Sequence, residues 1–322
     1  GAQALQNQNA GANAYNVAVG FQSGLNVTTG TSNTSLGGLS GDSLTTGSNN
    51  TALGYASLSG DIAGADNVAV GFGAMSATDN ARANVAIGFN ALTALDYGTL
   101  TYSHNIAIGF EAGKAITTGT LNTIMGGQAG DALTTGSSNV AIGTLALSTE
   151  DVGSRCVAVG YAALSVQNID GDVYNTAVGH AAGGAITSGV RNTIMGGLAG
   201  DALTTGNYNI AIGYAALSTE DQYGKNVAIG YRSLATQNAG SDAFNVAVGY
   251  DAGLSVTTGI RNTIIGGEAG DALTEGDYNI AIGYAALGTE DAGSKNVAIG
   301  YAALATQNAG VNVYNVAVGY QA

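Results

Sequence analysis

A six-residue motif recurs along this chain at nearly constant spacing. Its first copy, Asn-Val-Ala-Val-Gly-Phe, begins at Asn16, and its last copy begins at Asn315. There are eighteen copies, and thirteen of the seventeen intervals between their first residues are 17 residues long, the others being 19 or 21. A fixed period of this kind predicts a solenoid, in which each coil packs only on its neighbours.

The coils are grouped into a longer repeat of 70 residues. The copies that begin at Asn105, Asn175, Asn245 and Asn315 are separated by the same series of intervals, namely 17, 17, 17 and 19. Four coils therefore make one super-repeat, and the segments 201–221 and 271–291 of successive super-repeats are nearly identical. Such similarity indicates duplication of an array whose length matters more than any one position.

The motif reads as a short β-strand. With its first residue as position 1, the coil has Asn at position 1 in all copies except Cys156, and Gly at position 5 in all eighteen. Positions 2 and 4 are mostly Val, Ile, Leu, Met or Thr, position 3 is usually Ala, and position 6 is Tyr or Phe in twelve copies. β-Branched and aromatic residues between Asn and Gly clusters are typical of strands.

The two faces of this strand differ in size. Alternate strand residues face opposite sides, so Val17, Val19 and Phe21 share one face while Ala18 and Gly20 share the other. We expect the Ala and Gly side to line a thin interior and the Val, Ile and Tyr side to need a cover. The competing packing is a monomer with the large residues inside.

The rest of the coil offers little to cover the large-residue face. In Ala215 to Lys225 we expect a second short strand over Leu217 to Thr219 and a polar turn, but no helix. The simplest cover is other copies of the chain, and a ring of three is the simplest closed arrangement. We therefore predict an all-β, parallel β-solenoid of about 18 coils that assembles as a homotrimer. Handedness does not follow from the pattern, because tight solenoids escape the usual right-handed rule.

Composition excludes several classes of protein. The chain has 52 Gly and no Pro, but its Gly is periodic and 45% of its residues are apolar, so it can bury a core and is not disordered. We expect residues 1–322 to form one solenoid array. Both ends of the sequence fall within a coil, so we also expect a section of a longer fibre.

Charge and hydropathy exclude two kinds of binding partner. The net charge is −14, with eight basic residues, so nucleic acid is not expected as a partner. No run of about 18 apolar residues and no leader segment is present, so we expect no membrane insertion by this segment.

The motifs resemble a known family of surface proteins. The segments Asn226 to Gly230 (NVAIG), Asn279 to Gly283 (NIAIG) and Asn315 to Ala322 (NVAVGYQA) are similar to the head repeats of trimeric autotransporter adhesins. They also resemble repeats of phage tail fibres and other bacterial surface fibres. The resemblance implies a left-handed β-roll, a homotrimer and an extracellular location, although the 17-residue coil is longer than the family's usual coil.

Acidic residues are the first candidates for chemistry. Asp42, Asp131, Asp201 and Asp271 follow Gly in turns, but the last three are four coils apart and could not share an ion, so no metal site is expected. Adjacent acidic pairs recur once per super-repeat, and we expect them to be solvated charges rather than catalytic carboxylates. These pairs are Glu150 with Asp151, Glu220 with Asp221, and Glu290 with Asp291.

Other unusual residues have structural interpretations. Cys156 replaces the position-1 Asn, so its coil is expected to be a local weak point rather than a reactive site. His104 and His180 replace aromatic residues, and we expect them to stack in those columns. Thr-Thr-Gly triplets suggest an ice-binding alternative, against which their absence from many coils weighs. The triplets begin at Thr28, Thr45, Thr117, Thr134, Thr204 and Thr257.

The sequence thus predicts a protein without catalysis, cofactor or metal. The leading interpretation is a structural or adhesive segment of an extracellular trimeric fibre, which mediates surface attachment or acts as a spacer. The first alternative is a phage tail-fibre segment that carries a receptor-binding tip, and the second is an ice-binding solenoid. The expected partners are other copies of the chain and a glycan or protein receptor on a host surface. No convergent group of residues marks the ligand site.

Overall fold

A computed structural model describes residues 1–11, 13–308 and 314–322. All regular structure in these residues is β-strand, and the predicted strand is present in each of the eighteen coils. The chain divides into two compact units, which we call unit 1 (Gly1–Cys156 with Asn168–Asp172) and unit 2 (Val157–Gln167 with Val173–Ala322). Each unit is a parallel β-solenoid, as the period predicted.

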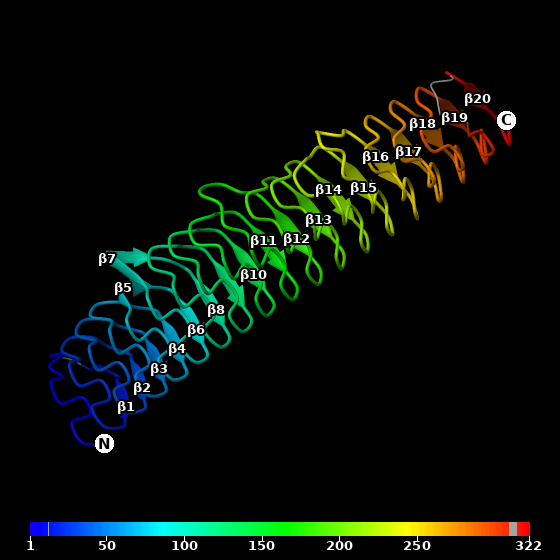
Figure 1. Ribbon diagram of the computed structural model, residues 1–322. Helices are drawn as coiled ribbons and strands as arrows, with labels where there is room; N and C mark the ends of the chain where they lie inside the picture. Colours follow the sequence, from blue (N-terminus) through cyan, green and yellow to red (C-terminus); the bar gives the residue numbers. More distant parts are fainter. Residues whose placement is uncertain (12, 309–313) are drawn as a thin grey trace. The chain divides into compact units, whose positions relative to one another are not determined.

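In unit 1, eight three-residue strands form one parallel ladder. They pair in chain order with every motif position in register with the same position of the next coil. The ladder strands are β1 Val17–Val19, β2 Thr34–Leu36, β3 Thr51–Leu53, β4 Val68–Val70, β6 Val85–Ile87, β8 Ile106–Ile108, β9 Thr123–Met125 and β10 Val140–Ile142. Apart from this ladder, β5 Asp79–Arg82 pairs in parallel with β7 Asp96–Tyr102 (Figure 1). Strand β7 lies within the 21-residue interval between Asn84 and Asn105.

In unit 2, ten strands of the same length form an uninterrupted parallel ladder. Figure 1 shows these strands side by side along one side of successive coils. The strands are β11 Val157–Val159, β12 Thr176–Val178, β13 Thr193–Met195, β14 Ile210–Ile212, β15 Val227–Ile229, β16 Val246–Val248, β17 Thr263–Ile265, β18 Ile280–Ile282, β19 Val297–Ile299 and β20 Val316–Val318.

The small residues of the strand face the interior. In β15, Ala228 is fully buried, while Val227 and Ile229 on either side of it are partly exposed. The same buried centre recurs in nearly every ladder strand. The expectation of a thin interior lined by Ala is therefore confirmed, and the competing packing with the large residues inside is not adopted.

Position 5 requires glycine for two reasons. The φ angle at Gly230 is 138°, and all eighteen position-5 glycines lie between 127° and 146°, a region closed to side chains. A Cβ built on Gly230 would also lie 2.1 Å from the carbonyl oxygen of Gly249 in the next coil. The glycine column therefore lets successive coils approach closely at the end of each strand.

The predicted second strand is absent. Leu217 and Thr219 lie in a turn region, and Ala215 and Leu217 have φ angles of 51° and 52°, which no strand allows. The amide of Leu217 still donates to the carbonyl of Ser233 in the next coil at 3.0 Å. Coil-to-coil hydrogen bonds thus continue past the strand, but through left-handed turns that propensity alone did not indicate.

The interior is filled in two alternative ways. Where position 9 is Gly, an aliphatic residue at position 12 occupies the space above it, and a Cβ on Gly183 would lie 2.9 Å from Cδ1 of Ile186. Where position 9 is Leu, as at Leu217, position 12 is polar in most coils, as at Glu220. In unit 2 each super-repeat has two coils of each kind, which gives a physical reason for its four-coil length.

The position-1 asparagines bind successive coils together. In coil 192, the side-chain oxygen of Asn192 accepts from the backbone amide of Asn209 at 2.9 Å, and its Nδ2 donates to the carbonyl of Gly206 at 2.9 Å. The column of asparagines therefore forms a ladder whose regular bonds run from side chain to backbone. Because Asn192 and Asn209 are fully buried, each bond satisfies a backbone group that water cannot reach.

Candidate interaction surface

One side of each unit carries exposed large apolar side chains. We call positions 2, 4 and 6 of the coils the outer face. Met195 and Ile265 at position 4 are 42% and 38% exposed, and Tyr214 at position 6 is 50% exposed. Among the described residues, all but four of the exposed large apolar side chains lie on this face or at the residue just before position 1.

Aromatic rings on the outer face stack from coil to coil. In unit 1, Tyr55, Phe72, Phe89 and Phe110 follow one another with ring centroids 5.3 to 5.4 Å apart. In unit 2 the rings form shorter series, the first two of which are followed by Gly197 and Gly267, and the ring planes lie within 21° of parallel. These series are Tyr161–His180, Tyr214–Tyr231–Tyr250 and Tyr284–Tyr301–Tyr320.

Apart from the imidazole of His180, the outer face contains no acidic or basic side chain. None of its positions in the eighteen coils is Asp, Glu, Lys or Arg, although the chain as a whole has a net charge of −14. The solvent-exposed face of a sheet normally carries polar or charged side chains, while the apolar ones point to the core. An uncharged, periodic and aromatic face is instead typical of a surface that another protein covers.

A second set of side chains lies at the edge of the outer face. We call the residue immediately before position 1 the flanking column. In unit 2 its members alternate between an aromatic and a basic residue without exception, and their side chains contact one another. The members are Tyr174, Arg191, Tyr208, Lys225, Phe244, Arg261, Tyr278, Lys295 and Tyr314.

The prediction that the adjacent acidic pairs are solvated is wrong for the glutamate of each pair. Glu150, Glu220 and Glu290 occupy position 12 and are fully buried, whereas Asp151, Asp221 and Asp291 remain at least partly exposed. The leucine at position 9 fills the space that an aliphatic position-12 residue fills elsewhere. The backbone amide three residues later, at Gly153 or Gly293, supplies a hydrogen bond of 2.7 or 2.8 Å to Glu150 or Glu290.

In unit 2, Glu220 and Glu290 each begin a series of side-chain hydrogen bonds in the interior. Gln307 donates to Oε2 of Glu290 at 2.8 Å, and Gln237 in the same way faces Glu220 at 3.4 Å. Asn245 then donates to Oε1 of Gln237 at 3.0 Å. Burial raises the pKa of Glu220, with the amide of Tyr223 acting in the opposite direction. Glu220, Gln237 and Asn245 are all fully buried, so we assign this series of hydrogen bonds a structural role.

Unit 1 has a less complete version of this arrangement. Asp61 occupies position 12 and is buried, with Thr78 at the same position of the next coil in place of a glutamine. Its Oδ1 accepts from the amide of Gly64 at 2.7 Å, but its Oδ2 and the hydroxyl of Thr78 have no hydrogen-bond partner among the described residues. Burial raises the pKa of Asp61 to about 6.

The turn aspartates do not converge. Burial raises the pKa values of Asp42, Asp131, Asp201 and Asp271, which are all partly buried. Lys114 lies 3.8 Å from Asp131 and opposes this effect there. In the part of the chain that the structure describes, no group of three or more His, Cys, Asp or Glu side chains could hold a metal ion.

The cysteine and histidines have structural surroundings. Cys156 is fully buried, and its amide donates to Oδ1 of Asn139 at 2.9 Å, so it keeps the backbone half of the asparagine pattern. His180 stacks on Tyr161 with centroids 5.3 Å apart, which confirms its expected place in the aromatic column. His104 stacks on Tyr102 of β7 at 5.9 Å, rather than on a ring of its own column.

The threonine triplets hold coils together. The first hydroxyl of each triplet donates to a backbone carbonyl of the next coil, for example from Thr204 to Asp221 at 2.8 Å. The same bond is made by Thr28, Thr45, Thr117, Thr134 and Thr257. These hydroxyls are already used in bonds between coils, and residues such as Ile62 and Asp151 interrupt their rows. Both observations weigh against the ice-binding alternative.

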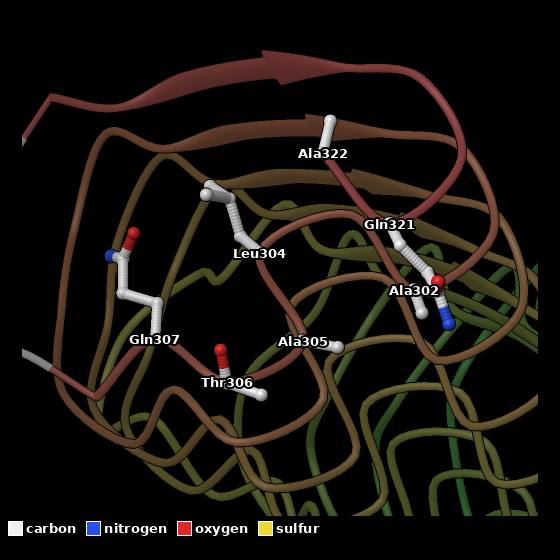
Figure 2. A pocket seen from close by; sticks show the side chains of 7 residues that line it. All are labelled: Ala302, Leu304, Ala305, Thr306, Gln307, Gln321 and Ala322. Atoms are coloured by element: carbon white, nitrogen blue, oxygen red, sulfur yellow. The ribbon is translucent and has the colours of Figure 1, made fainter.

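Surface hollows at two places gather no reactive groups. The first, of about 380 Å³, lies at the last coil of unit 2 over Leu304 and Gln307 and beneath Gln321 and Ala322 (Figure 2). The equivalent residues Leu234 and Gln237 are fully buried in their own coil. The second is an open depression in unit 1, lined by Asn7, Asn26, Thr28, Ser43, Thr45, Gly60 and Ile62.

Comparison of the chain with protein-family models, curated proteins and solved structures found no match. Within the described ranges, no helix has the length and apolar character needed to cross a membrane. Sequence reasoning identified the outer face from its two-residue alternation. It missed the flanking column, although alternate aromatic and basic residues before every motif of unit 2 could have revealed it.

Proposed function

We propose that this chain is a structural and adhesive segment of an extracellular fibre, in which copies of the chain cover one another's outer faces. The observation that carries the proposal is the outer face itself, which is apolar, aromatic and free of charge in a strongly acidic chain. Covering such a face removes apolar surface from water at about 25 cal/mol per Å². The proposal includes no catalytic step.

A homotrimer is the assembly we favour. Each chain has one outer face, and a ring of three turns all three faces toward a common axis and leaves none open. An isologous dimer would also bury the faces, and its mass would distinguish it. The resemblance to adhesin heads supports three chains and left-handed winding.

Within a fibre, the coil array acts as a spacer and as a surface for attachment. Its length is set by the number of super-repeats, so duplication extends it without a change in the coil. A cell-surface fibre and a virion tail fibre would use this segment in the same way. The sequence that adjoins it in the complete protein separates them, because an anchor barrel indicates a cell surface and a baseplate-attachment region indicates a virion.

The double variant Met195→Glu/Ile265→Glu tests the proposed assembly. Both side chains are exposed in one chain, so glutamate costs little there, but it would be buried without a partner in the covered face. We expect sedimentation equilibrium to show a mass near the 31.6 kDa of a single chain for the variant and a multiple of it for the wild type.

A matched control carries the same added charge elsewhere. Thr135→Glu/Thr205→Glu places glutamates at the position that Glu275 occupies in the last complete super-repeat, away from the outer face. This control should keep the wild-type mass. A wild-type chain that sediments as a monomer, or a face variant that stays assembled, would reject the proposal.

A further inference from the structure

The flanking column of unit 2 is built so that its side chains project away from the strand. Its nine members all have positive φ angles, between 54° and 65°, which non-glycine residues seldom adopt. The column keeps this conformation whether the side chain is aromatic or basic. The rings of Tyr208, Phe244 and Tyr278 are 46% to 51% exposed, so the column is a surface feature.

The basic residues lie over the rings that separate them. The guanidinium of Arg191 is 5.6 Å from the ring centre of Tyr208, and that of Arg261 is 5.3 Å from Tyr278 and 5.9 Å from Phe244. The ammonium groups of Lys225 and Lys295 lie 5.1 Å from Phe244 and Tyr314. These contacts fix the cations in a row and leave part of each ring open.

Three of the four cations lack a carboxylate partner. Lys225 pairs with Asp242, whereas Arg191, Arg261 and Lys295 make no ion pair among the described residues. Acidic residues outnumber basic ones by 22 to 8 in this chain, so neutralising partners could readily have been placed nearby. A row of cations without such partners is the chemical complement of an anionic ligand.

The spacing specifies what kind of anion fits. Successive cations are two coils apart, which corresponds to about 9.6 Å along the ladder, and an aromatic ring lies between each pair. This interval is close to the length of a disaccharide in an extended polysaccharide. A polymer with one acidic group on every second sugar would therefore meet a cation with each acidic sugar and a ring with each neutral sugar.

We infer that the flanking column of unit 2 binds a linear acidic polysaccharide that carries one carboxylate per disaccharide. The carboxylates pair with Arg191, Arg261 and Lys295, while Lys225 keeps Asp242 as its partner, and the apolar faces of the intervening sugars stack on Tyr208, Phe244 and Tyr278. The inference rests on the adhesive part of the proposed function, for which it supplies a ligand class. It does not depend on self-association, because every member of the column belongs to one chain.

Hyaluronan oligosaccharides, in which glucuronate alternates with a neutral sugar, are the probe. We expect the full-length protein to bind them saturably in a calorimetric titration, and to bind neutral dextran of the same length much more weakly. Binding should weaken strongly in about 1 M salt, since exposed charges are screened there. Absence of hyaluronan binding, or equal binding of dextran, would overturn the inference.

Matched variants locate the site. Arg191→Gln/Arg261→Gln/Lys295→Gln should weaken hyaluronan binding by about tenfold or more, because three charge contacts are lost. Arg82→Gln/Lys114→Gln/Arg232→Gln removes the same number of charges outside the column and should bind within about twofold of the wild type. Equal affinity of the two triple variants would assign the binding elsewhere and overturn the inference.

A purely structural column would give a different result. In that case the first triple variant would melt at a lower temperature, and the wild type would not bind hyaluronan, which also overturns the inference. The more conservative Arg191→Lys/Arg261→Lys keeps the charges and should retain binding if the full replacement fails to fold. The solution mass, measured separately, shows whether self-association stands or fails independently.

Discussion

Unit 1 and unit 2 are built from the same coil but differ in how regularly other side chains recur on it and inside it. Both have the position-1 asparagine, the buried position-3 residue and the position-5 glycine. Unit 2 adds an alternating flanking column and complete Glu–Gln–Asn series. Unit 1 has the buried carboxyl groups of Glu150 and of Asp61, the latter beside Thr78, and a side pair of strands, β5 and β7. The coil frame therefore does not need these additions, which vary while the frame persists.

Substitutions at the position-5 glycines test whether both units share the same coil structure. They are expected to change the free energy of unfolding more than any other substitution proposed for these units. Gly126→Ala in unit 1 and Gly266→Ala in unit 2 place a Cβ at 2.6 Å and 2.5 Å from the carbonyl groups of Gly143 and Gly283, at φ angles of 135° and 137°. We expect each to lower the free energy of unfolding by at least about 3 kcal/mol, measured by denaturant titration.

The adjacent glycines provide the controls. A Cβ on Gly127 would meet nothing within 4 Å, and one on Gly267 would meet only ordinary contacts at 3.6 Å or more. Alanine there should change stability by less than about 0.5 kcal/mol. A large effect in one unit and a small one in the other would break the idea of a common frame.

The interior polar chain of unit 2 gives the next largest effect. Gln237→Leu removes the donor to Glu220 and to Oδ1 of Asn226, and the acceptor for Asn245. We expect a loss of about 2 to 4 kcal/mol in thermal or denaturant unfolding, because a buried carboxylate loses its partner.

The double variant Glu220→Leu/Gln237→Leu separates that penalty from packing. Leu203 and Leu273 already occupy position 12 in other coils, although there position 9 is Gly. Removing both polar groups should recover at least half of the loss, since an unpaired buried charge no longer remains. If the double variant were as unstable as the sum of both single variants, packing alone would explain the effect.

Unit 1 should respond to pH through Asp61. Folded Asp61 keeps its proton up to about pH 6, against 3.8 for an unperturbed carboxyl, so the folded state binds more protons between these values. The stability that this group contributes is therefore present below about pH 4 and is lost as pH rises through 6. Asp61→Asn cannot ionise, and its oxygen can still accept from Gly64.

We expect Asp61→Asn to be about 2 to 3 kcal/mol more stable than the wild type at pH 7.5. The difference should vanish near pH 4, as followed by denaturant midpoints across pH. Glu220→Gln in unit 2 should show a smaller gain, because Gln237 already donates to that carboxylate. A gain that is independent of pH would show that Asp61 does not titrate as described.

The smallest effect is expected where the asparagine column is interrupted. Cys156→Asn restores the amide donor of the other coils at a buried position of unit 1, where the thiol makes only a weak donor contact of 3.8 Å to the carbonyl of Ser154. We expect stabilisation of about 1 kcal/mol, the usual net value of one hydrogen bond, seen as a higher melting temperature. A lower melting temperature would mean that the cavity is shaped for sulfur and that this coil is not a weak point.

The sequence was sufficient to predict those features that depend only on one coil and its nearest copy. Alternation within the motif gave the buried Ala228 and the outward Ile229, and a fixed period gave the parallel register. The second strand at Leu217 was wrong because left-handed turns repeated in every coil have no local propensity signal. The prediction that Glu220 is solvated was wrong, because its burial depends on another residue of the same coil. Leu217, three positions earlier, fills the interior where other coils have an aliphatic residue at position 12.

The most direct test of the central claim is the mass of the wild-type chain in solution, measured by light scattering after size exclusion over a wide concentration range. If copies cover one another's outer faces as proposed, the mass is about three times the 31.6 kDa of one chain and does not fall on dilution. A monomer at every concentration, with the outer face open to solvent, would contradict the account.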